Sequence, residues 1–187
     1  MENLLQFLES IHPMTDGLKQ HLGTILKLKE LSKKEYLLKS GQVARKICFI
    51  GQGLLRCFYI KDGHEISSWF MKQGDVIISV ESFFSQKPSY ESVQALEDSI
   101  LYYITYEELQ AVYRNYPEFN FIGRVLLEKY YTLSEQRLFS LRMQRAQERY
   151  DYLLKHHSEL VLRVPAKHLA SYLGITEVTI SKIKARM

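Results

Sequence analysis

Residues 117–141 constrain the fold more than any other part of the sequence, because nothing in them interrupts a single long helix. Pro117 suits the first turn of a helix, and no proline or glycine follows Gly123 in this stretch. Apolar side chains recur there at intervals of three and four residues, which is the period of an amphipathic helix. The pattern predicts one helix over residues 117–145, with a stripe formed by Phe119, Ile122, Leu126, Tyr130, Leu133, Arg137 and Leu141.

The expected helix has more apolar surface than one side of a small β-domain covers. Val125, Leu127, Tyr131 and Leu138 form a second partial stripe beside the first. Surplus apolar surface of this kind favours pairing with a second helix. We therefore predict a homodimer formed through the first stripe. Packing of the whole helix within its own chain stays open as the alternative.

The segment before the helix, from Glu35 to Ile104, has the pattern of short β-strands. Runs of β-branched and aromatic residues alternate with turn residues at regular spacing, which is typical of an antiparallel sandwich or barrel. Asp62-Gly63 lies between two such runs and predicts a hairpin, because both residues tolerate positive φ. The expected strands are Ile47–Ile50, Leu54–Ile60, Ile66–Phe70, Val76–Val80, Ser92–Leu96 and Ile100–Ile104.

Short helices are expected on both sides of the strand region. Met14 to Leu22 has a helical pattern with Thr15 or Asp16 as its cap. Thr105 and Glu108 form a capping box that predicts a brief helix directly after the last strand.

Residues 146–187 have the spacing of a helix-turn-helix and a basic charge. They hold seven Lys and Arg against four Asp and Glu, so they account for +3 of the net charge of +4. Ala170 is small enough for two helices to cross closely, and Gly174 allows a tight turn between them. Ile180 and Ile183 would close the shared core. A helical hairpin without DNA binding is the alternative.

Such a motif predicts which side chains would contact DNA. Thr176 would cap a recognition helix from Glu177 to about Arg186, with its exposed face toward the major groove. The expected contacts to base edges are Thr176, Glu177, Val178, Ser181, Lys182 and Ala185. The expected contacts to phosphates are Lys167, His168, Thr179, Lys184 and Arg186.

A β-domain, a long helix and a helix-turn-helix in this order resemble the catabolite activator and fumarate-nitrate regulator (Crp/Fnr) family of bacterial transcription factors. The segments that carry the resemblance are Lys39–Gln42, Cys48–Arg56, Gln73–Asp75, Leu169–Thr176 and Thr179–Ile183. The last two are similar to the compact members common in Bacteroidetes-type bacteria.

The resemblance implies an α+β fold with a cyclic-nucleotide-binding-like β-roll of the jelly-roll type over residues 1–116. It further implies a dimerisation helix over residues 117–145 and a helix-turn-helix domain over residues 146–187. The implied function is that of a homodimeric, cytoplasmic transcription regulator that binds a palindromic operator in double-stranded DNA. RNA polymerase is a further candidate partner.

The effector site departs from the family pattern for a cyclic nucleotide. Members that bind one have a Gly-Glu-Leu type turn and then an Arg-Ser or Arg-Ala pair, whereas this chain has no glutamate in Val76–Ser79 and no arginine in Ser89–Ser92. We therefore do not expect cyclic AMP to bind. A neutral or cationic small molecule is one expectation, and a roll filled by its own side chains is the other. The expected pocket residues are Gly74, Asp75, Ser79, Glu81, Ser82, Phe83, Ser89 and Tyr90.

Several other classes of protein do not fit the sequence. Cys48 and Cys57 have no metal-ligand spacing, so buried thiols are expected rather than a zinc or iron-sulfur site. His64 is the one histidine inside the strand region, too few for a metal enzyme of the cupin type. We expect no enzyme, no resident cofactor, no signal peptide and no membrane span. A sensor module with weak or lost sequence-specific DNA binding remains the alternative function.

Overall fold

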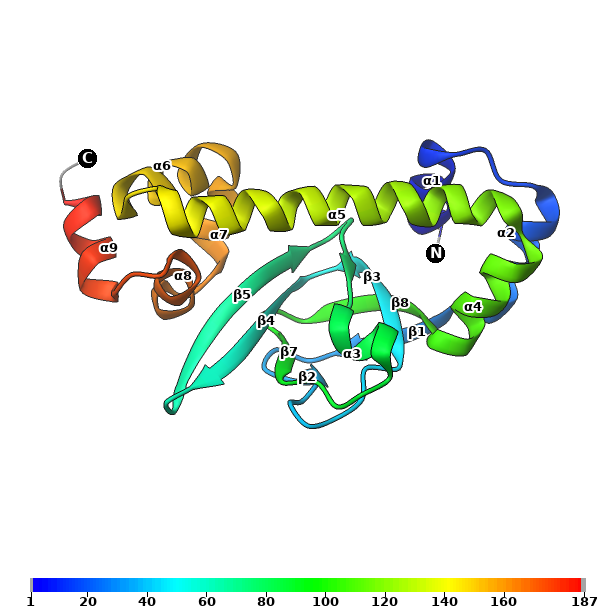
Figure 1. The fold of residues 1–187 in the computed structure, drawn as a ribbon, viewed down its shortest axis with the longest axis horizontal. Helices are drawn as coiled ribbons and strands as arrows, with labels where there is room; N and C mark the ends of the chain where they lie inside the picture. Colours follow the sequence, from blue (N-terminus) through cyan, green and yellow to red (C-terminus); the bar gives the residue numbers. More distant parts are fainter. Residues whose placement is uncertain (1, 186–187) are drawn as a thin grey trace.

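The computed structural model describes residues 2–185, apart from the side chain of Lys184. A β-roll lies beside one long helix, α5 (Pro117–Met143), and shorter helices gather at the two ends of α5 (Figure 1). This is the α+β architecture that the sequence predicts.

The roll consists of two four-stranded sheets in which every neighbouring pair is antiparallel. The strand orders are β1-β8-β3-β6 and β2-β7-β4-β5. Asp62 and Gly63 join β4 to β5 with φ values of 52° and 76°, so the predicted hairpin is confirmed. The bounds are β1 (Lys27–Leu31), β2 (Tyr36–Leu38), β3 (Lys46–Gln52), β4 (Leu54–Lys61), β5 (His64–Lys72), β6 (Val76–Ile77), β7 (Glu91–Ala95) and β8 (Ser99–Thr105).

Side-chain caps fix where several of the helices begin. The Thr15 hydroxyl accepts a hydrogen bond from the Leu18 amide, and Thr105 and Glu108 make both bonds of the predicted capping box. Pro117 occupies the first turn of α5, as expected. The other helices are α1 (Glu2–Ile11), α2 (Asp16–Ile25), α3 (Val80–Ser85), α4 (Tyr106–Asn115), α6 (Ala146–His156), α7 (Ser158–Arg163), α8 (Ala166–Leu173) and α9 (Glu177–Lys184).

The structure differs from the predicted strands at β1, β2 and β6. β2 lies inside the predicted strand region but was not among the expected strands. β1 was not expected, because Lys27–Leu31 has three charged residues; it forms by pairing with β8 along its whole length. Val76–Val80 was expected as one strand, but only Val76 and Ile77 pair with β3. The chain then turns at Ser79 into α3, so the β-branched run is divided between two elements.

The apolar core has two parts. The larger part fills the roll and continues under α1, α2, α4 and the first half of α5. The smaller part lies between the roll and the C-terminal helices, where Leu54, Phe70 and Leu96 pack with residues of α6 to α9 such as Tyr150 and Leu169. The C-terminal helices are therefore docked on the roll, with an apolar contact that is continuous with their own core.

Candidate effector cavity and nucleic-acid interface

The helices α8 and α9 meet at a tight turn. Gly174 ends α8 with a φ of 64°, a left-handed conformation that favours glycine. Thr176 then caps α9, its hydroxyl accepting a hydrogen bond from the Thr179 amide at 3.1 Å. Ala170, Ile180 and other aliphatic side chains are buried where the two helices cross. The two helices and their turn are thus as the sequence predicts.

One face of α9 is open to solvent. Val178 is 63% exposed, and the other residues expected to contact bases are exposed with it: Thr176, Glu177, Ser181, Lys182 and Ala185. Thr179 is partly covered, and its hydroxyl lies 2.9 Å from that of Thr176. Lys167 is exposed on α8. The side chain of Lys184 and the whole of Arg186, both expected to contact phosphates, lie outside the described residues.

His168 does not project from α8 as predicted. Its Nδ1 lies 2.7 Å from Nη1 of Arg56, a residue of β4. A guanidinium only donates hydrogen bonds, so the imidazole accepts and is neutral. Burial, together with the positive Arg56, lowers the pKa of His168. The expectation that His168 contacts a phosphate is therefore corrected, since the roll holds this side chain.

The expected dimerisation stripe on α5 mostly faces its own roll. Phe119 and Ile122 are buried in the larger core, and Leu126 packs against it. The Tyr130 hydroxyl accepts a hydrogen bond from the Val76 amide at 2.8 Å. Arg137 donates to the Tyr172 carbonyl at 2.7 Å and stacks on the Tyr172 ring. The prediction that these five side chains form the dimer contact is therefore corrected, because they contact the roll and α8 of their own chain.

The stripe residues of α5 that remain exposed are Leu127, Tyr131 and Leu138 of the second stripe together with Leu133 and Leu141 of the first. Leu127 and Tyr131 are 60% and 66% exposed, and Leu138 and Leu141 are also open to solvent. Together with Ser134 they follow a spacing of four, three, four and three residues along the helix. This is the spacing of a coiled-coil seam. We call these five residues the α5 seam. Leu133, from the predicted stripe, is also exposed but does not belong to the seam.

A cavity of about 700 Å³ lies between α5 and the roll. Four of the expected pocket residues line it, namely Ser79, Glu81, Ser89 and Tyr90. The other four do not. The Ser82 hydroxyl accepts a hydrogen bond from the Ala44 amide and donates one to the Lys87 carbonyl. Phe83 is fully buried in the core. Gly74 and Asp75 make the turn before β6.

The polar end of the cavity is built by hydroxyls and one carboxylate. The Ser79 and Ser89 hydroxyls lie 3.0 Å apart, and the Glu91 amide donates to Ser89 Oγ at 3.0 Å. Glu91 is 9% exposed, and its side chain also lines the cavity. Burial raises the pKa of the Glu91 carboxyl, while hydrogen bonds from Ser79 and Tyr59 oppose that rise.

The expected pocket residues do not include Tyr59, Trp69 or Glu91, although the sequence places Glu91 close to the expected phosphate position. Tyr59 pairs with Glu91 across β4 and β7, and Trp69 pairs with Cys57 across β5 and β4. The alternation of side chains along a strand places these residues on one face. The register that brings them together depends on a bulge between Cys57 and Phe58, for which the sequence has no clear signal.

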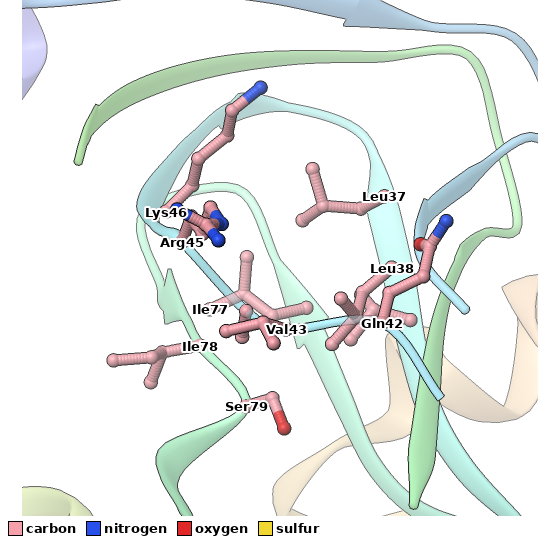
Figure 2. Close-up of a pocket in the computed structure, with 11 residues that line it drawn as sticks. Leu37, Leu38, Gln42, Val43, Arg45, Lys46, Ile77, Ile78 and Ser79 are labelled. Atoms are coloured by element: carbon pink, nitrogen blue, oxygen red, sulfur yellow. The ribbon is translucent and has the colours of Figure 1, made fainter. Parts of the chain in front are cut away.

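A smaller cavity of about 200 Å³ adjoins this end of the roll. Figure 2 shows its aliphatic walls, with Leu37 and Leu38 facing Ile77 and Val43, and with Arg45 and Lys46 at one rim. Ile78 and Ser79 line both cavities. Within residues 2–185, no group of three His, Cys, Asp or Glu side chains is placed to hold a metal ion.

Comparison with known proteins agrees with this geometry. Residues 28–116 match the family model of the cyclic nucleotide-binding domain. The fold is similar to that of FixK2 from Bradyrhizobium japonicum, with a TM-score of 0.72, 18% identity, and coverage of 87% of this chain and 84% of that one. A Eubacterium rectale structure assigned to the Crp/Fnr family of transcriptional regulators has a TM-score of 0.72 at 15% identity, covering 92% of this chain and 83% of that one. The chain has the Crp/Fnr fold.

The fold is also similar to that of CLP from Xanthomonas campestris, described as a c-di-GMP responsive global regulator. Its TM-score is 0.74 at 14% identity, and the alignment covers 92% of this chain and 91% of that one. A search of curated protein sequences finds no match. The segment that matches the cyclic nucleotide-binding domain ends at residue 116, directly before α5, and contains the polar end of the cavity. In the described part of the chain, no helix is both long and apolar enough to span a bilayer.

Proposed function

We propose that this chain is a homodimeric transcription regulator of the Crp/Fnr family that binds DNA through α8 and α9. The observation that carries the proposal is the exposed face of α9 in a chain with the Crp/Fnr fold. A helix that is capped after a tight turn and open along one side suits insertion into the major groove. We assign effector sensing to residues 1–116, dimerisation to residues 117–145 and DNA binding to residues 146–187.

Base recognition would come from the exposed side chains of α9. Lys182 is suited to donate to guanine O6 and N7, Glu177 to accept from a cytosine amine, and Val178 to contact a thymine methyl group. Lys167 on α8 would contact the backbone and set the register of the complex. Compact Bacteroidetes-type membership, a cytoplasmic location and contact with RNA polymerase stay predictions of the resemblance.

We propose the α5 seam, rather than the stripe first predicted, as the dimer contact. Its apolar residues are exposed in the single chain, and their spacing matches two helices that pack in parallel. Two-fold symmetry would then place the two α9 helices in successive major grooves, about 34 Å apart along the operator.

The cavity would receive the effector, and cyclic AMP is a poor candidate for it. Ser89–Ser92 is the stretch where the resemblance places the family's phosphate-binding arginine, and the buried Glu91 carboxylate within this stretch would repel a phosphate. A cavity of about 700 Å³ favours a ligand site over a roll filled by its own side chains.

Selection of binding sites from a random double-stranded DNA library tests the proposal. We expect enrichment of palindromic sites and an affinity that falls steeply with salt concentration. Steep salt dependence without any preferred sequence would overturn sequence-specific regulation and support the alternative of a sensor with lost DNA recognition.

The variant Lys182→Ala tests the assignment of base contacts. It should lose discrimination at one base pair per half-site by about 1–3 kcal/mol, measured as competition between operator variants. Lys87→Ala, in the loop between α3 and β7, removes the same charge from the roll and should leave discrimination unchanged. An equal loss on every sequence would show that Lys182 contacts phosphate instead.

A further inference from the structure

We infer that the cavity binds an apolar molecule that carries an amino group, with the Glu91 carboxylate as the anchor for that group. The inference rests on the proposed effector role of the roll and specifies the class of ligand. Its starting point is that Glu91 is a buried acid without a counter-charge. No lysine, arginine or histidine whose side chain the structure describes forms an ion pair with it.

The position of Glu91 makes its carboxylate available to a ligand. It begins β7 and lies opposite Tyr59 of β4, so both side chains share the face that is turned to the cavity. The Ser89 hydroxyl is already engaged by the Glu91 amide and by Ser79. The carboxylate accepts hydrogen bonds from Ser79 and Tyr59 but has no counter-charge, and burying it costs free energy that a ligand cation would offset.

The rest of the cavity suits an apolar, partly aromatic body. Trp69 and Met71 of β5 lie on the same side of the sheet as Tyr59, and Leu127 and Tyr131 close the cavity from α5. Aromatic faces attract cations as well as apolar groups. The volume of about 700 Å³ falls in the usual range for small-molecule sites.

The charges around the cavity also favour a cation. Glu81 and Glu91 line it, against one base, Arg124. Arg124 is paired with Glu128 at 2.6 Å. Arg137 approaches Trp69 from outside the lining, where its guanidinium is held by the Tyr172 carbonyl. A carboxylate or phosphate ligand would meet the uncompensated Glu91, whereas an ammonium group would neutralise it.

The test is isothermal titration calorimetry of the full chain with two matched sets of compounds. Tryptamine, tryptophol and indole-3-propionate share an indole ring and differ in the head group, and decylamine, decanol and decanoate share an alkyl chain. In at least one set we expect the amine to bind about tenfold more tightly than the alcohol, because it adds a charge-assisted hydrogen bond. The acid should show no binding at the same concentration.

The variant Glu91→Gln keeps the shape of the side chain and removes its charge. It should weaken binding of the amine by about 10- to 100-fold, the effect of losing a hydrogen bond to a charged group, and leave the alcohol nearly unchanged. Glu81→Gln, an exposed acid at the edge of the same cavity, should change the affinity for the amine by less than about threefold. Circular dichroism would show whether each variant is folded.

Three results would overturn the inference: no binding of either amine at millimolar concentration, an acid or alcohol that binds as tightly as its amine in both sets, or an amine affinity that Glu91→Gln does not change. Micromolar binding of cyclic AMP would also contradict it. The DNA selection described above is independent of these titrations. If the selection succeeds and the titrations fail, the ligand class is wrong and the regulator function stands.

Discussion

Arg56 of β4 links the roll to the C-terminal helices through a single guanidinium. Its side chain is almost fully buried, donates to Glu65 Oε2 at 2.7 Å and to Gln94 Oε1 at 2.8 Å, and stacks on the Phe58 ring. The remaining nitrogen meets His168 of α8. A planar group with donors on several sides can satisfy all three partners at once, which a lysine cannot do.

Removal of Arg56 should therefore be costly. We expect Arg56→Ala to lower the free energy of unfolding by about 2–3 kcal/mol, because it leaves Glu65 and Gln94 without their donor while Glu65 keeps partial access to water. Urea denaturation at neutral pH measures this. Arg45→Ala, an exposed arginine next to β3, should change the value by less than about 0.5 kcal/mol. Equal effects of the two substitutions would mean that the Arg56 contacts add nothing beyond a surface charge.

At the scale of the elements, the features that depend on a few adjacent residues could be predicted from the sequence. The features that depend on long-range contacts could not. The capping box at Thr105, the hairpin at Asp62-Gly63 and the turn at Gly174 each depend on a few adjacent residues, and all three were correct. β1 and α3 have weak local signals and form because of pairing and packing with distant segments. The same limit explains the missed pocket residues, which depend on strand register.

The error about α5 has a related cause. Periodicity predicts that a helix has an apolar face, but it does not say whether that face meets its own chain or another. Phe119 and Ile122 are apolar because the roll covers them, and Tyr130 and Arg137 bond to the roll and to α8. The exposed residues left for a partner come mainly from the less continuous second stripe.

The contact between α8 and the roll should depend on pH through His168. Its pKa is lowered on folding, so the folded state binds a proton less readily than the unfolded state. Its contribution to stability is thus present above the unfolded value of about 6.5 and is lost as the pH falls through the lower folded pKa. The charged groups that face it are Arg56, Glu65 and Lys167.

His168→Gln isolates this effect, because the glutamine carbonyl can accept from Arg56 but does not titrate. We expect the unfolding free energy of the native chain to fall, relative to that of the variant, as the pH drops below about 6.5. The native chain is compared with the variant because other groups titrate in both proteins. These groups include His157, whose pKa is also lowered, and Glu91, whose pKa is raised. Parallel curves for the two proteins would show that His168 is not the responsible group.

At the scale of the whole molecule, α5 connects all the other parts. Its first half lies over the roll, its seam borders the cavity, and its end reaches the C-terminal helices (Figure 1). Leu127, Tyr131 and Ser134 belong both to the cavity wall and to the seam. A ligand that moves these residues would therefore change the proposed dimer contact directly. It would shift the populations of two arrangements of the dimer only if it bound one of them more tightly than the other.

The seam makes a prediction about oligomeric state. In a parallel pair Leu138 would face its own copy, so Leu138→Glu places two carboxylates together and should weaken dimerisation by on the order of 100-fold. Sedimentation velocity over a concentration series measures this. Leu162→Glu introduces the same change at an exposed leucine of α7 and should leave the dimer intact. A monomeric native chain, or equal effects of the two variants, would contradict the seam.

Because the C-terminal helices are docked on the roll, they cannot be exchanged as an independent domain. Leu54, Phe70 and Leu96 of the roll share a core with Tyr150 and Leu169, and Arg163 pairs across the same boundary with Glu97. A chimera that exchanges the C-terminal helices at residue 145 would replace one half of that core and leave the other. To exchange the proposed recognition specificity, one would therefore graft only the exposed positions of α9 and retain the rest of the chain as the scaffold.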